Sequence, residues 1–437
     1  MASSWSIYKL EDVADIGSSK RIKMADYVSE GVPFYRSKEI IEKNKGNEIS
    51  TELFITEEQF NAIEEKFGAP KELDILLTSV GTLGVPYQVQ KDEKFYFKDG
   101  NLTWLRNFKD FVNPRYVYFW LTSTIAKRKI DEVTIGSTQQ ALTIVALKSL
   151  TIELPPLKVQ NIVVQHLEAL TGKITLNRQT NQTLEQMAQV LFKSWFVDFD
   201  PVIDNALAAG NDIPDALQNK AEQRLQAQQL PDFKPLPDNI RALFPKEFEQ
   251  TGEPTIGIAG WIPKGWSSKY LSDLLEIKYG KDHKKLDEGE YPVYGSGGLM
   301  RRVDKFLYKG ESVLIPRKGT LSNIMYVNET FWSVDTMFFT IPKVPQIAKF
   351  AFYLLKRLNF DNMNVGSAVP SMTTKVLNAL PLVCPSENVL TKFDEIIELY
   401  FSKIRANQES SNQLEQLRGA LLPKLISGEI TINKEVG

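Results

Sequence analysis

The chain has 437 residues, a formal net charge of −2 and 43% hydrophobic residues. This composition is typical of a folded protein with several domains and excludes an extensively disordered chain. No apolar run reaches the ~18 to 20 residues of a membrane span, and the N-terminal residues contain no apolar signal core, so we expect a cytoplasmic protein with no membrane partner. The single cysteine, Cys384, excludes an intramolecular disulfide and a thiolate zinc cluster.

Charge is distributed unevenly along the chain. Residues 1–155 carry 20 Lys and Arg against 22 Asp and Glu, residues 201–260 carry 5 against 9, and residues 261–385 carry 17 against 11. A local surplus of positive charge suits a polyanionic partner such as nucleic acid. A basic surface without such a partner remains the alternative interpretation of the charge alone.

Residues 1–155 have the pattern of a small α+β domain. The runs DILLTSVG (74–81) and KFYFKDGNLTWLR (94–106) are apolar or aromatic and end in turn residues, which predicts strands. The run NPRYVYFWLTST (113–124) has helical spacing.

A long helix follows over residues 156–197. Apolar residues recur every three or four positions from Val159 to Trp195, which predicts a helix of ~39 residues and ~58 Å with a heptad-like seam. Residues 198–260 are rich in proline and acidic residues and read as a connector with one short helix around Asp215 to Gln229.

The same plan then returns. Residues 261–385 contain strand-like runs, ESVLIPRKGT (311–320) and FWSVDTMFFTIP (331–342), and a helical run, VPQIAKFAFYLLKRL (344–358). Residues 386–437 hold a second long helix, periodic from Val389 to Leu425, and a C-terminal tail.

At a constant offset of 230 residues, Gly136–Phe196 aligns without a gap with Gly366–Ile426, and about 15 of the 61 pairs are identical. So long a period indicates a domain duplication rather than a solenoid. We expect the two long helices to pair antiparallel, which would place Asn177 opposite Asn407 in the seam. A polar pair there would fix the register of the helices. The alternative is that both asparagines face solvent.

Candidate DNA-binding residues lie at matching places in the two copies. Arg and Lys can neutralise phosphates or read guanine, Asn and Gln can read adenine, and hydroxyl groups can bond to phosphate. The candidates are Arg36, Ser37, Lys38, Ser79, Thr82 and Gln139 in the first copy, and Lys281, Lys284, Lys285, Arg301, Arg302, Arg317, Lys318, Thr320 and Asn323 in the second. For any one of them, a solvated surface position is the competing interpretation.

Catalytic patterns are scarce. The sequence has no G-x-x-x-x-G-K-[ST] loop, and its two histidines are isolated. Asp74, Asp92 and Lys94 are weakly similar to the carboxylates and lysine of a metal-dependent nuclease, and this is one alternative function. A helical scaffold that binds no DNA is the other.

The sequence resembles the specificity (S) subunits of type I restriction-modification systems. The resemblance spans nearly the whole chain and is carried by four features: the two repeated helical segments ending in LEQ, the KSWFVDFDPV segment (193–202), the connector from LFPKEFE (243–249) to GWIPKGW (260–266), and the GTL turns at Gly81 and Gly319. The globular domains match only in outline.

The resemblance implies a non-catalytic subunit in which residues 1–155 and 261–385 are target-recognition domains and residues 156–197 and 386–437 are spacer helices. It implies binding to double-stranded DNA with a split recognition sequence, and docking of two methyltransferase (M) subunits and of motor-nuclease (R) subunits. Cofactors would lie on those partners, as S-adenosylmethionine, ATP and magnesium, with none on this chain.

Overall fold

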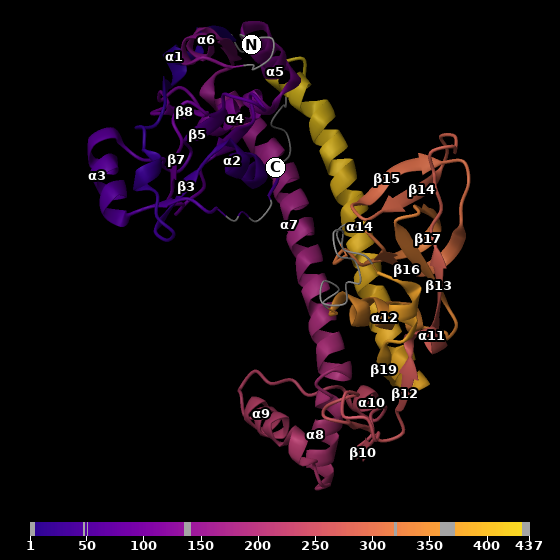
Figure 1. The fold of residues 1–437 in the computed structure, drawn as a ribbon. Helices are drawn as coiled ribbons and strands as arrows, with labels where there is room; N and C mark the ends of the chain where they lie inside the picture. The colour runs from indigo at the N-terminus through magenta and orange to yellow at the C-terminus, as the bar shows by residue number, and fades with distance from the viewer. Residues whose placement is uncertain are drawn as a thin grey trace, which may run out of the picture. The chain divides into compact units, whose positions relative to one another are not determined.

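The computed structural model describes residues 5–46, 49, 51–134, 141–318, 321–358 and 372–430. By its contacts the chain forms two compact units, one of Met1–Gln179 with Asn407–Gly437 and the other of Thr180–Ala406. Each unit combines a globular domain with half of each long helix (Figure 1). The candidate residues Gln139 and Thr320 lie outside the described residues.

The globular domain of unit 1 is built from short strands and helices. Its strands form a four-stranded sheet of order β2-β8-β5-β6, a three-stranded sheet β4-β3-β7 and a two-stranded sheet β1-β9. In chain order the elements are β1 (Ser6–Lys9), α1 (Leu10–Val13), β2 (Asp15–Gly17), η1 (Met24–Asp26), β3 (Val32–Tyr35), α2 (Ser37–Asn44), β4 (Phe54–Ile55), α3 (Glu57–Phe67), β5 (Ile75–Thr78), β6 (Pro86–Gln88), β7 (Tyr96–Phe97), β8 (Leu102–Arg106), α4 (Pro114–Thr122), α5 (Thr124–Val133), α6 (Ile144–Ser149) and β9 (Thr151–Leu154).

The globular domain of unit 2 is built around one six-stranded sheet of order β13-β18-β16-β17-β14-β15. The single apolar run at 331–342 supplies parts of two strands, β17 and β18, which flank β16 on either side. The elements are β12 (Ser267–Tyr270), α11 (Leu271–Leu274), β13 (Leu275–Tyr279), β14 (Tyr291–Gly295), β15 (Gly298–Val303), β16 (Tyr308–Pro316), β17 (Met325–Ser333), β18 (Met337–Pro342), α12 (Ile347–Lys356), α13 (Thr374–Asn378) and β19 (Pro381–Cys384).

The central strand of each domain is buried on both faces. In β5, Leu77 belongs to the core that contains α4, whereas its neighbour Leu76 belongs to a separate core on the other face. In β16, Val313 packs in the core with α12 and the adjacent Leu314 packs in the opposite core. Because neighbouring strand residues point to opposite faces, a continuous apolar run is needed at both places.

The two domains are closed in the same way. In unit 1 the first strand, β1, pairs antiparallel with the last, β9, and in unit 2 β12 pairs antiparallel with β19. The helix before each closing strand is capped by a threonine at equivalent positions, Thr143 accepting from the Ala146 amide and Thr373 from the Val376 amide. The chain therefore enters and leaves each domain at one place, where its long helix begins.

The long helices are α7 (Leu157–Phe196) and α14 (Glu387–Ile426), and their bounds differ by the 230 residues of the sequence repeat. They run antiparallel within each unit. In unit 1, Val163 and Leu167 of α7 share a core with Leu422 and Leu425 of α14. In unit 2, Phe192 and Phe196 of α7 pack on Phe393, and their ring centroids lie 5.9 and 4.9 Å from its ring.

The connector contains more regular structure than the single short helix predicted. Alongside η2 (Asp215–Leu217) and α9 (Gln218–Gln228) it contains α8 (Asp200–Ala209), α10 (Asp238–Arg241) and the strand β10 (Phe248–Gln250), which pairs with β11 (Trp261–Pro263) just after the connector. Ile203, Leu217 and Ala221 form a small buried core. Apolar residues spaced for helices supply this core despite the many prolines and acidic residues.

Candidate nucleic-acid interface

A rigid basic loop precedes β14 in unit 2. Lys281, Lys284 and Lys285 are exposed on it, and at its far end the Asp304 amide donates to the Asp287 carbonyl at 3.1 Å. The Lys281 amide donates to the Ser333 carbonyl at 2.8 Å, and the Trp332 indole donates to the Lys281 carbonyl at 2.9 Å. The three ammonium groups are therefore displayed to solvent from a fixed backbone, which suits contacts to phosphate.

Arg301 and Arg302 are neighbours on β15 and have different surroundings. The Arg301 guanidinium donates to the Leu286 and His283 carbonyls at 2.5 and 3.3 Å and ties the basic loop to the sheet. Arg302 is exposed, and its Nη1 donates to the Glu290 carbonyl at 2.5 Å. Arg301 is therefore occupied in holding the loop, and only Arg302 presents its charge to solvent.

The turn after β16 carries Arg317, Lys318 and Asn323. The Arg317 guanidinium lies 5.2 Å from the Tyr279 ring and donates to the Asp335 carbonyl at 3.2 Å, while Lys318 is exposed. Asn323 donates its amide to the Ser296 carbonyl at 2.6 Å, which joins two loops. A guanidinium stacked on a half-exposed tyrosine is a surface that can stack on or bond to nucleic acid.

In unit 1 the candidate residues divide into structural and exposed ones. Ser79 is 5% exposed and its hydroxyl bonds to Thr103 at 2.6 Å, so its side chain is part of the interior. The Ser37 hydroxyl donates to the Asn101 carbonyl at 3.2 Å. Arg36 bonds to the buried Glu39 carboxylate at 2.7 Å, which holds the pKa of Arg36 above its ordinary value.

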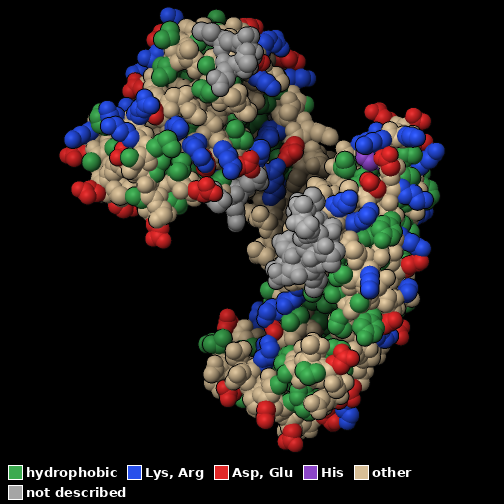
Figure 2. All heavy atoms as spheres, in the orientation of Figure 1, with side chains coloured by type: hydrophobic (Ala, Val, Ile, Leu, Met, Phe, Trp, Pro, Cys, Tyr) green, Lys and Arg blue, Asp and Glu red, His purple; other side chains and the backbone are tan. Residues whose placement is uncertain are grey.

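Lys38 and Thr82 are the two described candidates of the first copy that are exposed. On the face shown in Figure 2, Lys and Arg side chains are spread among acidic and apolar ones in both units rather than gathered in one continuous patch. On this face the positive side chains of unit 2 therefore form several separate groups.

Both globular domains are attached to a long helix by an ion pair at equivalent places. In unit 1, Arg115 of α4 binds Glu168 of α7 at 2.5 Å. In unit 2, Lys349 of α12 is 3% exposed and binds Glu311 and Asp394 at 2.9 Å and Glu398 of α14 at 3.2 Å. Burial raises the pKa of Asp394 despite its bond to Lys349. These contacts set how each domain sits on its helix.

The two seam asparagines are buried in unit 1. Asn177 is 3% exposed and Asn407 is 6% exposed. The Asn177 side-chain amide donates to the Asn407 carbonyl at 3.3 Å and to the Ser411 hydroxyl at 3.2 Å. Buried amides that bond across a helix pair favour one alignment over its neighbours, so a role in register stays our prediction for them.

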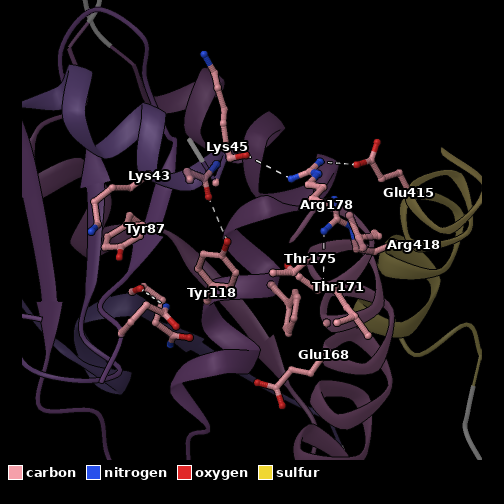
Figure 3. Close-up of a pocket in the computed structure, with 18 of the residues that line it drawn as sticks. Lys43, Lys45, Tyr87, Tyr118, Glu168, Thr171, Thr175, Arg178, Glu415 and Arg418 are labelled. Atoms are coloured by element: carbon pink, nitrogen blue, oxygen red, sulfur yellow. Dashed lines mark hydrogen bonds and ion pairs between the residues drawn. The ribbon is translucent and has the colours of Figure 1, made fainter. Parts of the chain in front are cut away.

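Sequence reasoning missed a second set of cations, which lines a groove of unit 1. Lys43, Lys45, Arg115, Arg178 and Arg418 line this groove with Tyr87, Tyr118 and Thr171 (Figure 3). One sequence signal could have indicated it. Arg418 interrupts the apolar seam of α14, whereas its repeat partner at position 188 is an alanine.

Two of the three residues of the nuclease alternative, Asp74 and Lys94, are engaged with different partners. Asp74 is 9% exposed and accepts hydrogen bonds from the Trp104 indole at 2.8 Å and the Lys71 amide at 3.0 Å. Lys94 forms an ion pair with Glu57. Among the described residues, no group of three His, Cys, Asp or Glu side chains is placed to hold a metal ion. Within the described part of the chain, no helix is both long and apolar enough to cross a membrane.

Comparison with known proteins agrees with this architecture. The family model described as "Type I restriction modification DNA specificity domain" matches residues 2–186 and 263–416, well over half of the chain. The type I restriction enzyme HindI specificity subunit of Haemophilus influenzae is 28% identical over 73% of this chain and 78% of its own length. The MjaIX specificity subunit of Methanocaldococcus jannaschii is 23% identical over 98% of this chain and 94% of its own.

A solved structure shares the fold. The S subunit of a type I restriction-modification system from M. genitalium superposes with a TM-score of 0.58 at 16% identity, covering 97% of this chain and 96% of that one. The two matched regions contain the two globular domains and most of both long helices, so the predicted α+β repeat is confirmed. The chain therefore belongs to the family of type I restriction-modification DNA specificity subunits, and the expectation of a non-catalytic subunit is confirmed by that membership.

Proposed function

We propose that this chain is the DNA-recognition subunit of a type I restriction-modification complex, that it binds a target split into two half-sites, and that it directs partner methyltransferase and motor-nuclease subunits to that target. One observation carries the proposal. A globular domain is attached twice to the start of a 40-residue helix, with the two helices 230 residues apart in sequence. Two domains of one plan with different sheets are suited to reading two different short sequences.

The exposed polar groups support contact with a duplex. In the second domain Lys284, Lys285, Arg302 and Lys318 are exposed on loops and on the strand β15. Such cations neutralise phosphates and position a protein on DNA, while base edges are read in the grooves. In the first domain, Lys38 and Thr82 would have this role.

The long helices offer places for partner subunits. Met187 of α7 and Leu417 of α14 occupy equivalent positions of the repeat, and each is 46% exposed. Val190 and Leu399 are 67% and 71% exposed. Apolar side chains at equivalent positions of two helices would bind two copies of one partner, and this supports two M subunits. Those subunits would carry S-adenosylmethionine, and the complex would act in the cytoplasm.

The test is an exchange of one globular domain. Residues 266–385 are replaced by the matching segment of a relative, the chain is assembled with its cognate M subunits, and methylated sites in DNA are mapped by sequencing. One half of the methylated motif should change while the other stays. If both halves changed, or neither, independent reading by two domains would be wrong. Methyl transfer or DNA cleavage by the purified chain alone would also contradict the proposal.

A further inference from the structure

Unit 1 contains a polar groove that the proposed function does not use. The groove has a volume of about 990 Å³ and lies between α4, the end of α2, the first half of α7 and the last part of α14 (Figure 3). Its lining includes five Lys and Arg side chains and two carboxylates, those of Glu168 and Glu415. The lining therefore carries more positive than negative charge.

Arg178 lies at the edge of the groove and has donors to spare. Its Nη2 binds Glu415 at 2.8 Å and its Nη1 donates to the Lys45 carbonyl at 3.3 Å. A guanidinium has five N–H donors, and these two bonds use two of them. The ion pair with Glu415 joins side chains that are 55% and 39% exposed, and ion pairs this exposed contribute little to stability. Breaking this ion pair so that Arg178 could bind a ligand would therefore require little free energy.

Arg418 is half-buried beside Arg178. Its guanidinium bonds to the Thr171 hydroxyl at 3.5 Å, and Figure 3 shows the two arginines close together above Thr171 and Thr175. No carboxylate partner of Arg418 is found among the described residues. Burial raises the pKa of Tyr118, and the positive charge of Arg418 offsets part of that effect. Two guanidinium groups and two hydroxyls thus converge on one part of the groove.

The equivalent place in unit 2 is filled. There Phe401 stands at the repeat position of Thr171, and Tyr326 packs on Phe352 and Phe401 with ring centroids 6.1 and 5.0 Å away. In the sequence repeat, Arg178 corresponds to Gln408 and Arg418 to the buried Ala188. The repeated plan therefore does not require these cations, since neither arginine has a basic counterpart in the repeat.

We propose that this groove binds the sugar-phosphate backbone of DNA, with Arg178 and Arg418 contacting phosphate oxygens and the Thr175 hydroxyl donating a hydrogen bond beside them. Thr171, whose hydroxyl donates to the Leu167 carbonyl at 2.9 Å and accepts from Arg418, would position the Arg418 guanidinium. This inference rests on the proposed function, since DNA must lie against unit 1 for its first domain to read a half-site. Guanidinium groups bind phosphate through paired donors, and helix hydroxyls commonly complete such contacts. The groove would add affinity without adding sequence information, and it would do so on one half of the molecule only.

The experiment uses the complete chain assembled with its M subunits. Arg178→Gln, Arg418→Gln and the double variant are compared with the starting protein for binding to a duplex that carries the mapped target, over a range of salt concentrations. The slope of log K against log salt should fall by about 0.9 for each arginine removed. Lys392→Gln, which removes a cation from the same helix α14 where it pairs with Glu395, should leave the slope unchanged.

A second measurement locates the contact. Single phosphates are replaced by neutral methylphosphonates along the target. At one or two positions the replacement should weaken binding of the starting complex but not of the double variant. The methylated motif should be the same for all variants, because no base contact is removed.

The outcomes separate the two hypotheses. If the starting complex shows no salt-dependent binding, the proposed function fails and this inference fails with it. If the starting complex binds DNA and the folded double variant keeps the full slope, only the groove assignment is wrong. If the double variant no longer assembled with the M subunits, the groove assignment would also be wrong, because the groove would then bind a protein partner.

Discussion

Glu168 of α7 and Glu398 of α14 occupy the same position of the repeat, and each carboxylate binds a cation from the globular domain of its own unit. Glu168 receives Arg115 at 2.5 Å, and Glu398 receives Lys349 at 3.2 Å. The two contacts differ in burial, since the Arg115 side chain is 42% exposed and the Lys349 side chain is 3% exposed. An ion pair between the globular domain and the long helix is thus present in both copies, but its contribution to stability differs between them.

This difference predicts unequal effects of removing the two cations. Lys349→Met would leave three carboxylates around an apolar side chain, and breaking a buried ion pair costs about 3 to 5 kcal/mol. Arg115→Met removes an exposed pair and should cost at most about 1 kcal/mol of the free energy of unfolding. Urea unfolding followed by tryptophan fluorescence measures both. Similar small losses for the two variants would show that the carboxylates around Lys349 are rehydrated at little cost.

The neighbours Arg301 and Arg302 should respond in opposite ways. Arg301→Ala removes the bonds to two loop carbonyls and should destabilise the protein by about 1 to 3 kcal/mol. Arg302→Ala should leave stability within about 0.5 kcal/mol and lower the salt slope of DNA binding by about 0.9. Thermal melting and salt-dependent binding of the assembled complex distinguish them. An unchanged slope for Arg302→Ala would place that residue away from the DNA.

Asp198, which follows α7, gives a pH-dependent prediction. Burial raises the pKa of this carboxyl, but the hydrogen bonds from Lys193 of α7 and Lys220 of α9 outweigh burial and hold the pKa below its ordinary 3.8. A lowered pKa in the folded state means that the stabilisation is present above pH ~4 and is lost as the pH falls below it. Asp198→Asn should therefore cost stability, on the order of 1 kcal/mol, at pH 7 and progressively less under acid.

Melting temperatures at pH 7, 5, 4 and 3 test this dependence. Asp212→Asn, which changes an exposed residue of the same connector, is the control. The difference between its melting temperature and that of the starting protein should not shrink as the pH falls. A difference between Asp198→Asn and the starting protein that stayed constant down to pH 3 would mean that Asp198 acts through packing rather than charge.

The long helices give a test of spacing. One heptad is inserted after Asn181 as a copy of residues 175–181, and another after Ser411 as a copy of residues 405–411. The copies continue the apolar seam, and each contains a second asparagine equivalent to Asn177 or Asn407, so each asparagine can still face a polar residue. Each helix gains ~10 Å. If the helices separate two half-sites, the unspecified gap between them should grow by about three base pairs while both half-site sequences persist.

Bending or twisting of DNA can absorb part of the added length, so the direction of the change is the critical result. Methylation mapping measures the gap. A single insertion after Asn181 alone, which shifts the seam of one helix against the other, serves as the control and should abolish stable assembly. An active, folded double-insertion variant that kept the original gap would show that the helices do not set the spacing.

The long helices and the duplication could be predicted from sequence because their signals are local and repeated. Apolar residues at three- and four-residue steps over 40 positions leave one secondary structure that can bury them, and the constant offset requires the second helix to match the first. The seam position of Asn177 and Asn407 followed from the same periodicity. The strands 75–78 and 102–106 and the helix 114–122 could also be predicted, because the spacing of their apolar residues is a local signal.

The roles of single polar residues were decided by tertiary structure. Arg301 and Arg302 are adjacent and chemically identical, yet Arg301 is partly buried and bonds to two carbonyls of the basic loop, whereas Arg302 is exposed and bonds to one carbonyl, that of Glu290. Ser79 is interior because Thr103 of a neighbouring strand faces it. Arg418 lines a groove beside Thr171, whose counterpart in the repeat is Phe401. Composition and periodicity indicate that a residue can bind DNA, but which of its donors remain exposed depends on residues far away in the sequence.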